Sequence, residues 1–126
     1  DKIIVRFAGR NEVPTLLSFS TYSLFFIKPC YSKLASSPTK HGEIMAMGIP
    51  VIANSGVGDV KEIIEKYESG FVLDHFTEAE MENIIDKAID PKTKFDAYKI
   101  REGARDFYNL EKTVNTYKQV YKKLLG

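Results

Sequence analysis

The feature that most constrains the fold is a regular alternation of short apolar runs with segments of helical pattern. Four runs rich in β-branched and aromatic residues predict strands, at residues 3–7, 22–27, 50–53 and 71–73. Helices are expected after them, starting at Glu12, Ser37, Asp59 and Thr77, with two more at residues 95–108 and 111–125. This order predicts right-handed βαβ units and an α/β fold, a Rossmann-like parallel sheet flanked by helices with a helical C-terminal tail at residues 92–126.

Local patterns sharpen these expectations. The run at residues 22–27 is mostly apolar, which is typical of a parallel strand buried on both faces. Ser37 is expected to cap its helix with Pro38 as the first helical residue, and Gly48 to end it. Capping-box spacing occurs twice, at Asp59 with Glu62 and at Thr77 with Glu80.

Charge and composition exclude several classes of function. The chain has 126 residues with 18 basic and 17 acidic side chains interspersed, a net charge of +1. Nucleic-acid binding needs clustered basic residues, so no nucleic-acid partner is expected. No apolar run approaches the ~20 residues of a membrane-spanning helix. The single cysteine, Cys30, has no partner for an internal disulfide, and His41 and His75 show no metal-ligand spacing, so neither a metal nor a cofactor is expected.

The start of the chain suggests a fragment. The first predicted strand follows Asp1 and Lys2 directly, with no initiator methionine and no leader sequence. A doubly wound domain usually has six strands, whereas four are predicted here. We therefore expect a single domain cut from a larger protein, with the missing strands before Asp1.

The loop that leads into the helix near residue 39 is the strongest candidate site. In open α/β sheets, ligands bind beyond the carboxyl ends of the strands. Ser36, Ser37, Thr39 and Lys40 place hydroxyls, an ammonium and backbone N–H groups at one helix start, which favours an anion such as phosphate. Glu43 lies about one turn further on, within reach of a neighbouring hydroxyl. A diphosphate next to a ribose or sugar fits both features; alternatively, Ser37 and Pro38 are only a good cap and Glu43 only a solvated helix residue.

A second loop, at residues 54–58, is a weaker candidate. Gly56 and Gly58 would let the backbone approach a ligand closely. The loop lacks both the GxGxxG fingerprint and the ending of a P-loop. A tight turn before a helix explains the two glycines equally well.

A family resemblance extends this interpretation. The segment Ser-Ser-Pro-Thr-Lys-His-Gly-Glu-Ile-Met-Ala-Met-Gly-Ile-Pro-Val-Ile-Ala, residues 36–53, resembles the E-x-M-A-x-G-x-P-V-I core of retaining GT-B glycosyltransferases of group 1, the GT4-like type. Flanking pieces at residues 7–9, 56–59 and 70–73 match in the correct order, so the resemblance covers about residues 3–89.

The resemblance implies the C-terminal, donor-binding half of a two-domain GT-B enzyme. It maps the family's second motif glutamate to Glu43, at the ribose of a nucleotide-sugar donor. The backbone of residues 37–40 would hold the diphosphate, and Gly9 with Arg10 would border the base. The implied partners are that donor and the acceptor-binding N-terminal domain of the parent chain. A cytoplasmic location, peripheral at the inner face of a membrane, is the matching expectation.

The sequence departs from the family pattern at one position. Group 1 enzymes carry E-x7-E, but Ala35 stands eight residues before Glu43. Ser36 or Ser37 is the candidate substitute at the sugar hydroxyls, and no catalytic residue is assigned. Two alternatives stay open. One is a non-catalytic binding or interaction module that kept the fold; the other is a flavodoxin-like domain, for which the acidic pair after the first strand is absent.

The last predicted helix also carries an expectation about assembly. Its apolar residues fall on one stripe that needs burial: Val114, Tyr117, Tyr121 and Leu124. We expect this stripe either to fold onto the domain's own sheet or to pair with another copy, and the chain to self-associate through it or through the edge strand at residues 3–7.

Overall fold

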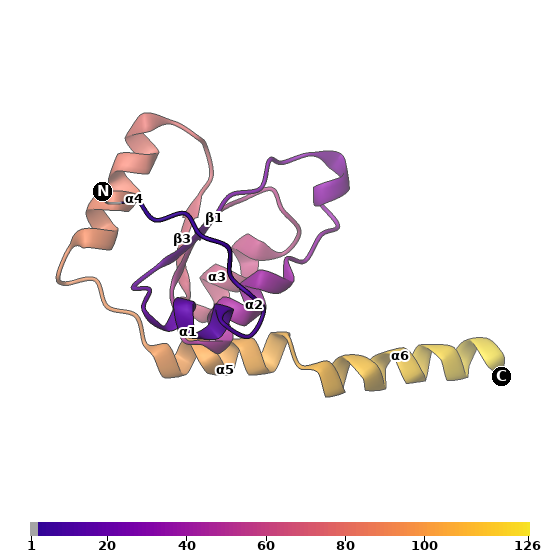
Figure 1. Cartoon of the computed structure of the whole chain (residues 1–126). Helices are drawn as coiled ribbons and strands as arrows, with labels where there is room; N and C mark the ends of the chain where they lie inside the picture. The colour runs from indigo at the N-terminus through magenta and orange to yellow at the C-terminus, as the bar shows by residue number, and fades with distance from the viewer. Residues whose placement is uncertain (1–2) are drawn as a thin grey trace.

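Three parallel strands form the centre of the structure, a computed structural model that describes residues 3–126 (Figure 1). The strands are β1 (Ser23–Phe25), β2 (Val51–Asn54) and β3 (Gly70–Leu73), in the order β1-β2-β3. In the register, Ser23 pairs with Val51 and Val51 pairs with Gly70. The parallel sheet flanked by helices confirms the predicted Rossmann-like α/β fold.

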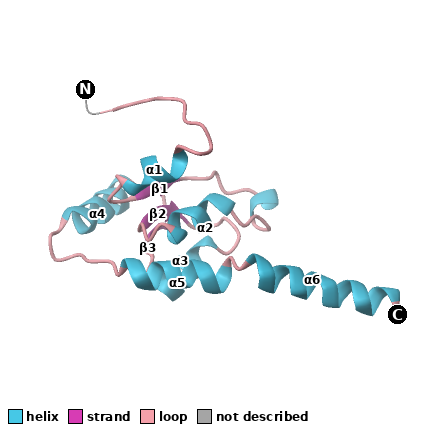
Figure 2. Cartoon of the chain, turned by 60° about the horizontal axis from the view of Figure 1, so that its bottom comes forward, coloured by secondary structure: helices cyan, strands magenta, loops and turns pink. Residues whose placement is uncertain are grey.

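Six α-helices are described. They are α1 (Val13–Ser18), α2 (Thr39–Ala46), α3 (Val60–Tyr67), α4 (Glu78–Ile89), α5 (Ala97–Phe107) and α6 (Leu110–Leu125), and a short 3-10 turn occupies Tyr31–Lys33. Each agrees with the predicted helix to within about two residues. Figure 2 shows α4 on one side of the strands and α2, α3 and α5 on the other.

The core has three parts. Two lie on opposite faces of the sheet, because alternate strand residues face opposite sides, and the third lies between helices. Val51 and Ala53 face α2 and α3, where the buried cluster also includes Ile44, Val60 and Ile64. Ile52 and Leu73 face α4 and meet Ile84. A separate cluster of Met45, Ile63, Ile100 and Ala104 binds α5 to the outer surfaces of α2 and α3.

The predicted strand at residues 3–7 is wrong. These residues form no ladder with any strand of the described chain, and Ile3, Ile4, Val5 and Phe7 are between 81% and 93% exposed. A β-branched run has the propensity for a strand, but a strand also needs a neighbour that offers its backbone groups. The sheet within residues 3–126 accordingly has three strands instead of four.

Burial of β1 on both faces is also wrong. Phe25 is buried, but Leu24 is 60% exposed and Phe26 is 48% exposed on the opposite face. Helix α4 contacts β3 and leaves the α4 side of β1 partly open. The apolar residues of β1 therefore line a cleft of about 230 Å³ beside Met81, Ile84 and Ile85.

The predicted caps are partly confirmed. Thr77 caps α4 by accepting a hydrogen bond from the Glu80 N–H at 3.3 Å. The Glu80 carboxylate instead accepts from the N–H groups of Asp74 and His75, each at 2.7 Å. Asp59 makes no capping bond to α3, and Ser37 does not cap α2, because Pro38 keeps an extended ψ of 112° and the helix starts after it.

Helix α6 extends away from the rest of the molecule (Figure 1). It has no buried residue, and the predicted stripe of Val114, Tyr117, Tyr121 and Leu124 is exposed. The stripe therefore does not fold onto the domain's own sheet. None of the helices within residues 3–126 has the length and apolar character to cross a bilayer.

We predict that this chain self-associates in a concentration-dependent manner, because an exposed apolar stripe of this size is unusual for a monomer. Tyr121→Lys places a charge on the stripe and should weaken association, whereas Gln119→Lys adds the same charge to the polar side of α6 and should not. Analytical ultracentrifugation measures both. A monomer at every concentration would contradict the prediction, and association unchanged by Tyr121→Lys would locate it at the free edge of β1 instead.

Candidate functional site

Two loops meet at the carboxyl edge of the sheet. One joins β1 to α2 and the other joins β2 to α3. The Gly58 N–H donates to the Lys33 carbonyl at 2.9 Å. A Cβ atom on Gly58 would lie 1.7 Å from the Ser36 carbonyl oxygen, so only glycine permits this approach. The two loops therefore form one continuous backbone surface in front of α2.

The first turn of α2 offers free backbone donors at this surface. Pro38 occupies the N-cap position, and no side chain caps the helix. Within residues 3–126, the N–H groups of Thr39 and Lys40 have no hydrogen-bond acceptor. Both residues and Ser37 are exposed. This end of the helix carries the positive end of its dipole, so it suits an anion.

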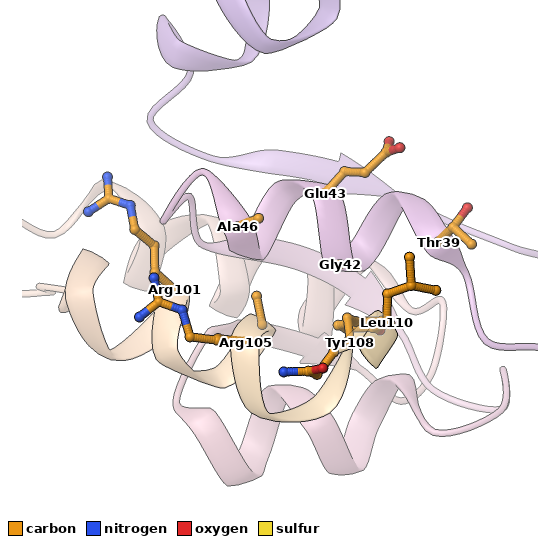
Figure 3. A pocket seen from close by; sticks show the side chains of 10 residues that line it. Thr39, Gly42, Glu43, Ala46, Arg101, Arg105, Tyr108 and Leu110 are labelled. Atoms are coloured by element: carbon orange, nitrogen blue, oxygen red, sulfur yellow. The ribbon is translucent and has the colours of Figure 1, made fainter. Parts of the chain in front are cut away.

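Two cavities flank the start of α2, and they divide the predicted site residues. A pocket of about 310 Å³ is lined by Ser36, Ser37, Gly58 and Ala35, together with Asp59 and Glu62. A groove of about 630 Å³ between α2 and α5 is lined by Thr39 and Glu43 on one side and by Arg101 and Arg105 on the other (Figure 3). Glu43 is exposed and points away from α5 (Figure 3).

The remaining predicted residues lie outside both cavities. Gly9 and Arg10 belong to a turn before α1, where the Gly9 N–H donates to Glu12 Oε2 at 2.8 Å. Gly56 is exposed, with a φ of +76°, and its α-carbon faces Pro29. Gly58, by contrast, lines the smaller pocket, where the close backbone contact described above positions it. The structure thus brings Ser36, Ser37 and Gly58 together around one pocket but does not bring Gly9, Arg10 or Gly56 to it.

A buried polar cluster beneath α2 was not anticipated from the sequence. His41 is fully buried, and its Nδ1 lies 3.3 Å from Tyr108 Oη at the end of α5. Its Nε2 has no hydrogen-bond partner among the described residues, and neither has Asp59 Oδ1. The signal that could have identified His41 is its spacing, because it lies three and four residues before the buried Ile44 and Met45.

Burial dominates the ionisation of this cluster. Desolvation lowers the pKa of His41 to about 4, although the Asp59 charge acts in the opposite direction. Desolvation also raises the pKa of Tyr108 to about 12; the Asp59 charge adds to this shift and the Ser37 hydroxyl opposes it. Both side chains are therefore neutral near pH 7.

Asn54 was predicted only as part of a loop, but it fixes the edge of the site. The Ile27 N–H donates to Asn54 Oδ1, and Asn54 Nδ2 donates to the Ile27 carbonyl, both at 2.8 Å. The side-chain amide thus continues the pairing of β1 with β2 beyond Phe25. Within residues 3–126, no three His, Cys, Asp or Glu side chains gather in a way that could hold a metal ion.

Comparison with known proteins adds one positive finding. The model of a protein family described as glycosyl transferases group 1 matches residues 2–106. This span contains the sheet, helices α1 to α4 and nearly all of α5, and it includes both loops of the candidate site. Searches of curated proteins and of solved structures gave no match.

Proposed function

The chain belongs to the group 1 glycosyltransferases, and from that premise we propose that it binds the nucleotide-diphosphate sugar donor of a sugar-transfer reaction. The parent protein would transfer the sugar to an acceptor held by its N-terminal domain. The observation that carries the proposal is the uncapped start of α2, with the N–H groups of Thr39 and Lys40 free at the carboxyl edge of the sheet.

The proposed chemistry is electrostatic. As the bond between the sugar and the diphosphate breaks, negative charge develops on the leaving diphosphate. The free N–H groups of α2, the positive end of its dipole and the Lys40 ammonium would stabilise that charge. These donors are already oriented by the fold, so little reorganisation is needed at the moment of reaction.

The cavities on either side suggest where the rest of the donor lies. Glu43 is one turn from the free N–H groups and is exposed, so its carboxylate can accept hydrogen bonds from the ribose hydroxyls. Ala35 lines the pocket on the other side next to Ser36 and Ser37. The side chains of Ser36 and Ser37 line this pocket together with the carboxylates of Asp59 and Glu62, and we propose the two serine hydroxyls, which adjoin Ala35, as the contacts to the sugar.

We predict that Glu43→Ala weakens the binding of nucleoside diphosphates by about 1–3 kcal/mol, the range for a charge-assisted hydrogen bond. Isothermal titration calorimetry with uridine, guanosine and adenosine diphosphates measures this change. Glu82→Ala, on the exposed surface of α4, is the matched control and should have no effect. Equal affinities for the wild type and Glu43→Ala would remove the proposed role of Glu43.

A non-catalytic binding module is the second candidate, and Ala35 is the observation that favours it. Such a module would bind the diphosphate but would not turn the donor over. Measuring sugar-nucleotide hydrolysis and transfer by the full-length parent protein separates the two proposals. Turnover supports the transferase, whereas binding without turnover supports the module.

A further inference from the structure

Tyr108 connects the C-terminal helices to the start of α2. It follows the last residue of α5, and α6 begins two residues later. Its ring lies directly on the backbone of Gly42, where an added Cβ atom would be 2.7 Å from the ring Cγ. Tyr108 also lines the groove beside Thr39 and Glu43 (Figure 3). Tyr108, which follows Gly42 by 66 positions in the sequence, therefore packs against the first turns of α2.

The imidazole of His41 is held between two rings. The ring centroids of Phe25 and His41 are 5.8 Å apart, and those of His41 and Tyr108 are 6.0 Å apart. The only hydrogen bond of the His41 side chain within residues 3–126 is the 3.3 Å contact between Nδ1 and Tyr108 Oη. The hydroxyl of Tyr108 is thus the one polar group that fixes the orientation of this buried ring.

The position of His41 makes this contact relevant to the site. His41 is the third residue of α2, directly after Thr39 and Lys40, whose N–H groups are free. Its own N–H closes the turn by donating to the Pro38 carbonyl at 3.0 Å. The Tyr108 side chain therefore contacts this turn at two consecutive residues, through its hydroxyl at His41 and through its ring at Gly42, next to the two free N–H groups.

We propose that Tyr108 is a positioning residue for the donor diphosphate: through its hydrogen bond to His41 and its contact with Gly42, it holds the first turn of α2 in the orientation that binds the anion. This inference rests on the proposed function. It assigns to the α5–α6 junction an indirect part in donor binding, which acts through the first turn of α2. The imidazole of His41 is fully buried, and a low-dielectric environment strengthens the hydrogen bond that it makes.

The test compares Tyr108→Phe with Tyr98→Phe, which changes an exposed tyrosine in helix α5. The probe is inorganic pyrophosphate, which carries no base or sugar. We expect Tyr108→Phe to raise the Kd for pyrophosphate about fivefold, the effect of losing one hydrogen bond, with an unchanged circular dichroism spectrum. Hydrogen exchange at the His41 amide, which donates to the Pro38 carbonyl, should become faster without ligand. Tyr98→Phe should change neither quantity.

A double-mutant cycle makes the role specific. If Tyr108 acts through His41, Tyr108→Phe should raise the Kd for pyrophosphate in the wild-type chain but not in the His41→Leu chain, and equal effects in both would contradict a role through His41. A Tyr108→Phe variant that binds as tightly as the wild type would overturn the inference and leave the proposed function intact. A wild-type chain that binds neither pyrophosphate nor nucleoside diphosphates would overturn the proposed function, and the inference with it.

Discussion

Replacing Gly58 with alanine is expected to destabilise the chain by about 3 kcal/mol or more and to abolish binding at the candidate site. Gly58 has a φ of +47°, a region that costs other residues about 1–2 kcal/mol. The larger effect is steric, because the new Cβ would be 1.7 Å from the Ser36 carbonyl oxygen. Backbone atoms cannot rotate away, so the two loops must separate. Urea unfolding measures the loss of stability.

Gly56→Ala is the matched control for this prediction. Gly56 lies in the same loop with a φ of +76°, but its nearest neighbour would be Pro29 Cβ at 3.2 Å. We expect Gly56→Ala to reduce the free energy of unfolding by only about 1–2 kcal/mol, the conformational cost of a positive φ in a residue other than glycine. If both variants lose the same stability, the contact between Gly58 and Ser36 does not hold the loops together.

Lowering the pH from 7 to 5 is expected to destabilise the chain by about 2 kcal/mol through His41 alone. The pKa of His41 is about 4 in the folded chain against 6.5 for the free side chain. Between these values the unfolded chain binds a proton that the folded chain excludes. Stability is therefore complete above pH 6.5 and is lost as the pH falls toward 4. Urea unfolding at a series of pH values measures the slope.

Two features of the chain make this measurement specific. His75 is exposed, so His75→Gln should leave the acid slope unchanged, whereas His41→Gln should remove most of it. A hydrogen bond from Tyr67 lowers the pKa of Asp106 to about 2. Protonation of Asp106 therefore destabilises the folded chain only below the pH range of this measurement. A wild-type slope between pH 7 and pH 5 equal to that of His41→Gln would show that the imidazole does not titrate with unfolding.

The order of elements could be predicted because it depends on local patterns. The spacing of Val60, Ile63, Ile64 and Tyr67 specifies one apolar face of α3, and three of these residues are buried in the structure. Gly48 has a φ of +74° and follows the end of α2, as expected for a residue that ends a helix. Such features involve residues a few positions apart, so one sequence is enough to identify them.

Two of the failures involve a partner distant in the sequence. Residues 3–7 have strand propensity, but no described strand lies beside them. Asp59 has the spacing of a helix cap, yet its Oδ1 is buried without a hydrogen bond near His41 and Tyr108. A capping interaction is local, whereas Asp59 acts on His41, 18 residues before it, and on Tyr108, 49 residues after it.

The candidate site was predictable to the same extent. Ser36, Ser37, Thr39 and Lys40 are neighbours in sequence at a helix start, so their proximity followed from the pattern. Tyr108 and Asn54 act on residues 67 and 27 positions away, His41 and Ile27. Neither contact leaves a trace in the local sequence, because each joins residues from different elements of the fold.

Helix α6 has a thermodynamic consequence of its own. None of its 16 residues is buried, so its helical state depends on its caps and on its own backbone hydrogen bonds. An isolated helix of this length is only marginally stable in water. Association through the apolar stripe would therefore also complete the folding of α6. The entropy lost when the helix becomes ordered would reduce the binding affinity. Calorimetry should then show a negative heat-capacity change larger than the covered stripe alone would give, because the helix folds as it binds.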